Sequence, residues 1–247
     1  MFALRRKWSR PFDLLRTKWT EVPVAKGRAK THDLQELPDE TLWQYWSEAW
    51  HEDAVTDFAH RGWYYCLYRD VLRGKRVLDV GSGLGFDAIT FAQAGAQITC
   101  LDIAESNLAA VCKLCRYRQI SGIDFFYMQD IQSLSALPGN YDVIWCGGSM
   151  HHAPFDVVHK EAQALLTHLR PDGRWIELGY PRARWERDGK LDFGKWGEKT
   201  DGGAPWVEWY DLEKIRSRLA PTRFEVVLHF SFHNDDFIWF DLLRVAE

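Results

Sequence analysis

The stretch Lys75-Arg-Val-Leu-Asp79-Val-Gly81-Ser-Gly83-Leu-Gly85-Phe-Asp-Ala-Ile89 decides the fold of this chain. Its first half is a short apolar run that predicts a buried strand. Three glycines at alternate positions then allow a sharp turn and let the backbone approach a ligand closely. The residues after Gly85 have helical periodicity, so free N–H groups and the positive end of a helix dipole would face that ligand. We therefore expect a strand, a glycine loop and a helix to form a binding site.

Beyond this stretch, strand patterns alternate with helical patterns along most of the chain. Strands are expected at 75–80, 97–101, 123–128, 141–146 and 174–179, and helices at 86–94, 105–118 and 156–170. Alternation at this spacing predicts a Rossmann-like α/β fold, with a parallel sheet and helices on both faces. A helix at 211–219 is followed by strands at 223–233 and 237–245. Only three residues join these last strands, which requires a C-terminal antiparallel hairpin.

The N-terminal part of the chain differs in charge from the rest. Residues 1–30 hold nine Lys and Arg against two acids, a net charge of +7, while the whole chain carries −4. Residues 31–247 therefore carry −11. Such an acidic body lacks the basic stripe of a nucleic-acid-binding domain, so we expect no nucleic-acid partner. No apolar run reaches the length of a membrane span, and the N-terminus lacks the apolar core of a signal peptide, so a cytoplasmic location is expected.

We divide the chain into a basic N-terminal arm (1–40) and one α/β domain that covers 41–247. Within that domain, residues 41–73 form an aromatic-rich helical cap whose rings mostly fill core. Residues 181–210, rich in Trp, Gly and charge, are expected to form a lid loop over a ligand, with tryptophans that have little core to fill. Residues 1–20 mix basic and large apolar side chains, which suits peripheral membrane contact, although an arm packed on its own domain is the alternative.

The spacing of the motifs selects the ligand. Asp102 ends the second expected strand, 21 residues after Gly81, where a carboxylate can accept hydrogen bonds from both ribose hydroxyls. A dinucleotide fingerprint, G-x-G-x-x-G, needs glycine at position 86, where this chain has Phe86. The tighter loop, with Asp79 at the strand end, resembles that of the class I S-adenosylmethionine-dependent methyltransferases. A dinucleotide-dependent oxidoreductase stays as an alternative.

This resemblance covers residues 75–180 in motif order and extends to the hairpin. It implies S-adenosylmethionine as cofactor, with the glycine loop on the methionine part, Asp79 on its ammonium group and Asp102 on the ribose. It further implies adenine contacts after the second and third strands and a motif in the fourth strand. The cofactor-binding residues that it implies are Asp79, Gly81, Gly83, Gly85, Asp102, Ile103, Asp130, Ile131 and Cys146.

Two histidines follow the fourth strand, at the edge of the sheet where α/β proteins bind ligands. Histidine titrates near neutral pH, which suits a general base, so His151 and His152 are the candidate catalytic residues. A His pair at this place is similar to that of small-molecule methyltransferases of the ubiquinone and natural-product groups. In some of these a histidine acts as base, and in others it only shapes the pocket. No acid cluster indicates a metal site, so no metal is expected.

These observations predict methyl transfer to a hydroxyl of a small molecule, either a sugar or glycan end or a secondary metabolite. The reaction would be an in-line displacement assisted by histidine. Two alternatives stay open: methylation of a small amine, and a non-catalytic subunit that only binds S-adenosylmethionine.

Overall fold

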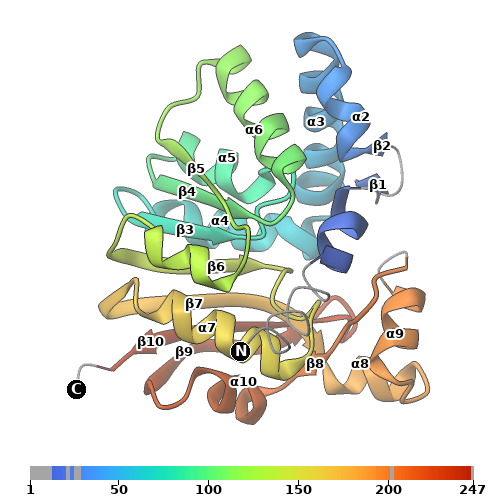
Figure 1. Cartoon of the computed structure of the whole chain (residues 1–247), viewed down its shortest axis with the longest axis vertical. Helices are drawn as coiled ribbons and strands as arrows, with labels where there is room; N and C mark the ends of the chain where they lie inside the picture. Colours follow the sequence, from blue (N-terminus) through green and yellow to red (C-terminus); the bar gives the residue numbers. More distant parts are fainter. Residues whose placement is uncertain (1–12, 21–22, 25–28, 201–202, 246–247) are drawn as a thin grey trace, which may run out of the picture. The chain divides into compact units, whose positions relative to one another are not determined.

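The computed structural model describes residues 13–20, 23–24, 29–200 and 203–245. These residues fall into two compact units. Figure 1 shows the helices and strands of both, with colours that follow the sequence from blue to red. One unit is Trp19–Tyr127. The other combines the described residues up to Lys18 with those from Met128 onward. Each unit has strands and helices of its own.

The unit Trp19–Tyr127 holds a parallel sheet in the order β5-β4-β3. Its strands are β3 (Arg76–Val80), β4 (Gln97–Asp102) and β5 (Ile123–Tyr127), which alternate with α5 (Phe86–Gln93) and α6 (Glu105–Arg118). Strand β4 is buried from its second residue to its last, as expected for a strand that is covered on both faces, and α5 and α6 pack against it. The register pairs Val80 with Leu101, so the glycine loop starts beside the end of β4.

The helical cap of this unit is a nearly continuous helical stretch. It consists of α3 (Asp39–His51), two π-helical turns (η1, Glu52–Thr56, and η2, Phe58–Gly62) and α4 (Trp63–Val71). The small hairpin of β1 (Pro23–Val24) and β2 (Ala29–Lys30) precedes it, together with α2 (Thr31–Glu36). Trp46, Tyr64, Tyr65 and Tyr68 are buried, as expected for core aromatics, whereas Phe58 is half exposed.

In the other unit, the strands follow in the order β6-β7-β10-β9, and β8 pairs with β7. The elements are β6 (Tyr141–Gly147), β7 (Leu169–Pro181), β8 (Trp209–Tyr210), β9 (Phe224–Phe232), β10 (Phe237–Arg244), the 3₁₀ helix η3 (Ile131–Ala136), α7 (Phe155–Leu166) and α10 (Leu212–Leu219). Strands β6 and β7 are parallel, and β10 is antiparallel to β7 and to β9. The predicted mixed α/β fold with a C-terminal antiparallel hairpin is confirmed.

One helix end and one strand start differ from expectation. The helix expected at 156–170 ends at Leu166, and the strand expected at 174–179 already starts at Leu169. The turn signal Pro171-Asp-Gly173 lies inside this strand, where the register with β6 jumps from Leu169 to Arg174. The extra residues form a bulge, which satisfies the turn signal without ending the strand.

The lid segment 181–210 is not the open loop that its charges and glycines indicate. It folds into α8 (Arg182–Arg187), α9 (Phe193–Thr200) and β8. Trp196 is fully buried in a small core with Tyr180 and Val207, and its Nε1 donates to Asp188 at 2.9 Å. The expectation that the lid tryptophans have little core to fill is wrong for Trp196, because the segment builds a core of its own.

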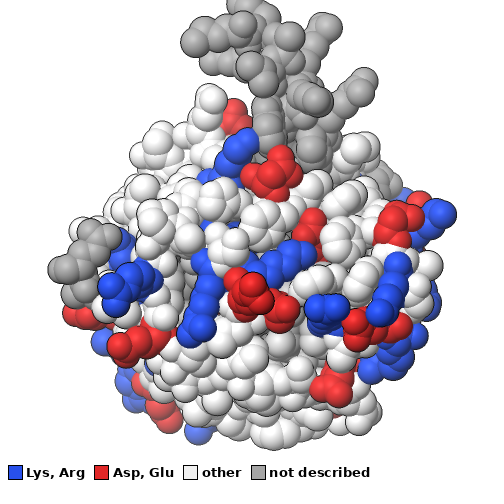
Figure 2. Space-filling model, turned by 90° about the horizontal axis from the view of Figure 1, so that it is seen from below, with Lys and Arg blue, Asp and Glu red and all other residues white. Residues whose placement is uncertain are grey.

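Part of the expected arm is described. Residues 13–20 are helical, and Leu15 and Leu34 are buried. Residues 1–12 lie outside the described part of the chain, and the predicted membrane contact falls mainly on them. No helix among the described residues is both long and apolar enough to cross a bilayer. Figure 2 shows acidic and basic side chains interspersed on one face of the molecule, without a continuous basic stripe.

Candidate functional site

The glycine loop between β3 and α5 is folded against the end of β4. The N–H groups of Gly81 and Ser82 donate to the carbonyl oxygen of Leu101 at 2.7 and 3.2 Å. Gly83 N–H donates to Asp102 Oδ2 at 2.9 Å. The three glycines, Gly81, Gly83 and Gly85, have φ angles of 71°, 53° and 69°, a region that other residues enter at a cost of about 1–2 kcal/mol. The loop conformation therefore favours glycine at all three positions.

Two of these glycines have different surroundings. A Cβ atom on Gly85 would lie 2.8 Å from Val111 Cγ1, so the absent side chain allows α6 to pack against the loop. A Cβ atom on Gly83 would meet no atom within 4 Å. Because Gly83 N–H is bonded to Asp102, this open space adjoins the carboxylate that is expected to hold a ribose. The backbone at Gly83 is thus open to a ligand.

Asp102 is buried and held in one orientation. Its Oδ1 accepts from Ala104 N–H at 2.8 Å, and its Oδ2 accepts from Asn107 Nδ2 at 3.1 Å in addition to Gly83. Burial raises the pKa of Asp102, and these hydrogen bonds oppose the rise. The backbone N–H of Ile103 acts on this carboxylate in the same way, so donors of the chain surround it on several sides. Ile103, the next residue, is half-buried.

Asp79 lies near the end of β3 and is buried, and its Oδ2 accepts no hydrogen bond from the described residues. Burial raises the pKa of Asp79 well above its ordinary value, and the negative charges of Asp87 and Asp102 raise it further. A cationic group at this oxygen would supply the missing donor and favour the ionised carboxyl. Asp79 therefore fits the ammonium group of an amino acid ligand.

The sequence did not reveal the cluster that holds the start of α5. Asp87, in the first turn of this helix, accepts hydrogen bonds from Tyr65 Oη at 2.7 Å and from Arg61 Nη1 at 3.0 Å. Just before it, the carbonyl oxygen of Leu84 accepts from Trp46 Nε1 at 2.9 Å. All three donors come from the helical cap. The dense Trp and Tyr of the cap were a signal, since buried rings of these types need partners for their polar atoms.

The other unit contains both candidate histidines, buried in the segment after β6. The ring centroids of His151 and His152 are 4.1 Å apart, and His151 also packs on Tyr180 at 4.4 Å. His152 Nδ1 lies 3.3 Å from the carbonyl oxygen of Ser149. Because a carbonyl oxygen only accepts, we assign the proton to Nδ1 and a lone pair to Nε2. His152 can therefore act as a base at Nε2, whereas His151 packs between two rings.

The remaining predicted cofactor residues also lie in this unit. Asp130 is exposed, and its Oδ1 accepts from Ser133 N–H at 2.8 Å, so it caps the 3₁₀ helix that Ile131 starts. Cys146 is buried in β6. Their contacts with a cofactor stay predictions. In the described part of the chain, no three His, Cys, Asp or Glu side chains gather as a metal site.

Comparison with known proteins gives matches to the central part of the chain. A family of methyltransferase domains matches residues 77–173. Over 108 residues, the chain is 40% identical to the ubiquinone biosynthesis O-methyltransferase of Bordetella parapertussis and 36% identical to that of Azotobacter vinelandii. These matches cover 42% of this chain and 42% and 43% of the two relatives. The chain thus spans about two fifths of the length of the curated relatives that it matches.

Solved structures give a wider match in fold. The magnesium protoporphyrin IX methyltransferase of Synechocystis PCC 6803, solved with bound SAH, has a TM-score of 0.58 with this chain. The two sequences are 22% identical, and the match covers 75% of this chain and 81% of that one. At this identity the comparison establishes a shared fold.

Proposed function

We propose, from the premise that residues 77–173 form a domain of the class I S-adenosylmethionine-dependent methyltransferases, that this chain methylates a hydroxyl of a small molecule. The resemblance seen in the sequence is confirmed over these residues, and S-adenosylmethionine is the cofactor. When bound, the cofactor supplies a methyl group on a sulfonium that is already a good leaving group. The observation that carries the proposal is the glycine loop closed onto Asp102, with Asp79 buried at the end of the preceding strand.

The cofactor is assigned to residues with distinct tasks. Asp79 would take the ammonium group, because its buried oxygen has no donor among the described residues. The loop backbone at Gly81, Gly83 and Gly85 would lie along the methionine part, and a Cβ atom on Gly83 would meet no atom within 4 Å there. Asp102 would accept from the ribose hydroxyls, and Ile103 would lie beside the adenine. Asp130 and Ile131 stay as predicted adenine-side contacts, and Cys146 stays as a predicted cofactor contact in the fourth-strand motif.

The chemical step needs a base when the acceptor is a hydroxyl. We assign this role to His152, whose Nε2 has the lone pair when Nδ1 donates to Ser149. His151 would hold the ring of its neighbour by packing between it and Tyr180. The relatives named as O-methyltransferases support a hydroxyl acceptor. The acceptor class stays as predicted: a hydroxylated secondary metabolite, or a sugar or glycan end.

A methyl-transfer assay with the full chain tests the proposal. The donor is S-adenosylmethionine with a labelled methyl group, and the probe acceptors are catechol, methyl glucoside and benzylamine. We expect label on a hydroxyl acceptor, and a loss of about 100-fold or more in kcat for His152→Ala. By calorimetry, Asp102→Asn should weaken S-adenosylhomocysteine binding by roughly 10- to 100-fold, whereas the matched control Asp124→Asn, on exposed β5, should not.

The other outcomes identify the alternatives. Label on benzylamine alone would mean an amine methyltransferase, because a neutral amine reacts without a base. Binding of the cofactor without transfer to any probe would favour a non-catalytic subunit. No heat with S-adenosylhomocysteine would remove the premise. The cytoplasmic location and the membrane contact of residues 1–20 stay predictions, taken from the sequence alone.

A further inference from the structure

The segment that carries both histidines is held in place by residues far along the chain. Glu208 is buried, and its backbone N–H donates to the carbonyl oxygen of His151 at 2.9 Å. Its Oε1 accepts from the backbone N–H of Phe155 at 2.9 Å. One residue therefore binds the backbone on both sides of His152.

The bond to Phe155 also fixes where α7 begins. The N-cap residue of this helix is Pro154, which offers no side-chain cap, and Phe155 is its first helical residue. A free N–H group there needs an acceptor, and Glu208 supplies it from the end of the lid segment. A carboxylate at a helix N-terminus is also favoured by the helix dipole. The start of α7 is thus held by the side chain of Glu208, and the histidine segment by the backbone N–H of the same residue.

The charge of Glu208 is balanced within the same cluster. Lys214 Nζ lies 2.7 Å from Glu208 Oε2, and Trp206 Nε1 donates to Oε1 at 3.0 Å. The ammonium group of Lys214 is further held over the ring of Trp209, 4.4 Å from its centroid, and it donates to the carbonyl oxygen of that residue. Because both oxygens have donors, the buried carboxylate is stable in this position.

We propose that Glu208 is the positioning residue for the base: it clamps residues 151–155, and so fixes the ring of His152 in the orientation that removes the proton from the acceptor. The inference deepens the proposed function and rests on it. Glu208 lies outside the matched residues 77–173.

The test uses the full chain with labelled histidine rings, observed by NMR without any acceptor. Variants at His151 and His152 assign their signals among the nine histidines. Glu208→Gln keeps an Oε1 acceptor for Phe155, so the His152 signal should stay close to wild type. The double variant Glu208→Leu with Lys214→Met removes the carboxylate bond to Phe155 and both charges together, and it leaves the backbone N–H bond to the His151 carbonyl in place. No buried charge is then left unpaired, which favours folding. The His152 signal of this double variant should broaden and move away from its wild-type position.

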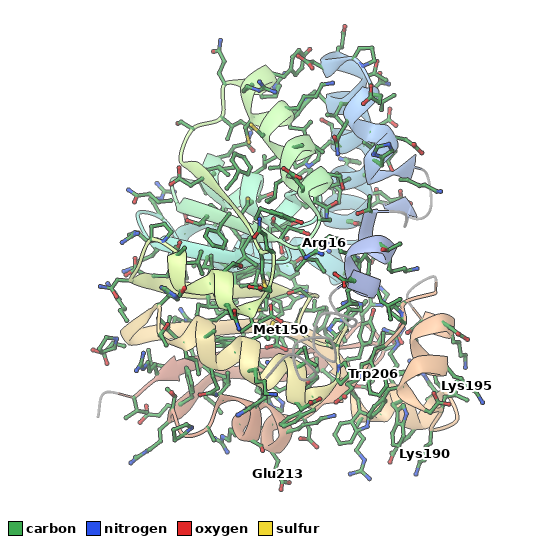
Figure 3. The ribbon with its side chains drawn as sticks, in the orientation of Figure 1. Arg16, Met150, Lys190, Lys195, Trp206 and Glu213 are labelled. Carbon is green, nitrogen blue, oxygen red and sulfur yellow. The ribbon has the colours of Figure 1, made fainter. Side chains whose placement is uncertain are left out.

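Glu213→Ala is the matched control. This residue lies beside Lys214 on α10, is exposed, and points outward in Figure 3. The control should leave both histidine signals and the activity unchanged. With catechol as acceptor, the double variant should lose roughly 10- to 100-fold in kcat with little change in KM for S-adenosylmethionine, since misplacing a reacting group by about 1 Å has that effect.

The outcomes separate the two proposals. A folded double variant with an unchanged His152 signal overturns the clamp, whatever the enzyme methylates. A wild-type chain that transfers no methyl group to any probe overturns the proposed function, and the histidine signals then still decide whether Glu208 fixes the segment. A double variant whose S-adenosylhomocysteine affinity falls together with kcat also overturns the inference, because a general structural loss would then explain both changes.

Discussion

Alanine substitutions at Gly83 and Gly85 should rank in opposite order when unfolding and cofactor binding are measured. Alanine at either position must adopt a left-handed backbone, which destabilises the fold by about 1–2 kcal/mol. At Gly85, the new Cβ atom also approaches Val111 Cγ1 to 2.8 Å and Cγ2 to 2.9 Å. Overpacking of this kind adds about 1–3 kcal/mol. Gly85→Ala should therefore lower the free energy of unfolding by about 2–5 kcal/mol, and Gly83→Ala by about 1–2 kcal/mol.

The order should reverse for the cofactor. The Cβ atom of Gly83→Ala occupies the open space beside Asp102, where the ligand is expected, whereas that of Gly85→Ala points at α6. Calorimetry with S-adenosylhomocysteine should therefore show the larger loss of affinity for Gly83→Ala. Urea unfolding should show the larger loss of stability for Gly85→Ala.

A third variant isolates the packing contribution. Val111→Ala removes the two methyl groups that the new Cβ atom meets, so the double variant Gly85→Ala with Val111→Ala should be more stable than the sum of the single losses predicts, by about 1–3 kcal/mol. Additive losses would refute the steric argument. Equal destabilisation by Gly83→Ala and Gly85→Ala would refute it as well.

Two further outcomes are expected. Burial raises the pKa of Glu161 to about 7, although Arg218 opposes the rise. Between about pH 4.5 and about pH 7, the folded state therefore keeps a proton that the unfolded state loses. The free energy of unfolding should fall over this range by up to about 3 kcal/mol. Glu161→Gln should flatten this decline in urea unfolding measured at about pH 5 and about pH 8, and an unchanged slope would contradict the assignment. Deleting residues 1–12, which removes four cations, should reduce co-sedimentation with anionic liposomes at low salt; equal pelleting of both proteins would rule out the membrane contact.

Local sequence was sufficient wherever one segment determines its own structure. The helix expected at 105–118 matches α6 at both ends, because a strand ending in Asp102 precedes it and a left-handed Gln119 follows it. The glycine loop and the terminal hairpin were predictable for the same reason. The lid segment was not, since the burial of Trp196 depends on Tyr180 and Val207, which lie 16 residues before and 11 residues after it. No local pattern contains that pairing.

The same limit explains why the groups that hold the glycine loop in place were missed. Gly83 and Asp102 are marked by spacing, but the groups that hold the loop carry no motif. The described part of the cap places Trp46 on Leu84 and Tyr65 on Asp87, one on each side of the glycine-to-helix junction. These contacts come from residues before position 77, where the methyltransferase family match begins. A loop that is fixed before the cofactor arrives loses less entropy on binding. The helical cap therefore supports the proposed cofactor site, although only the glycine loop and Asp102 indicate that site in the sequence.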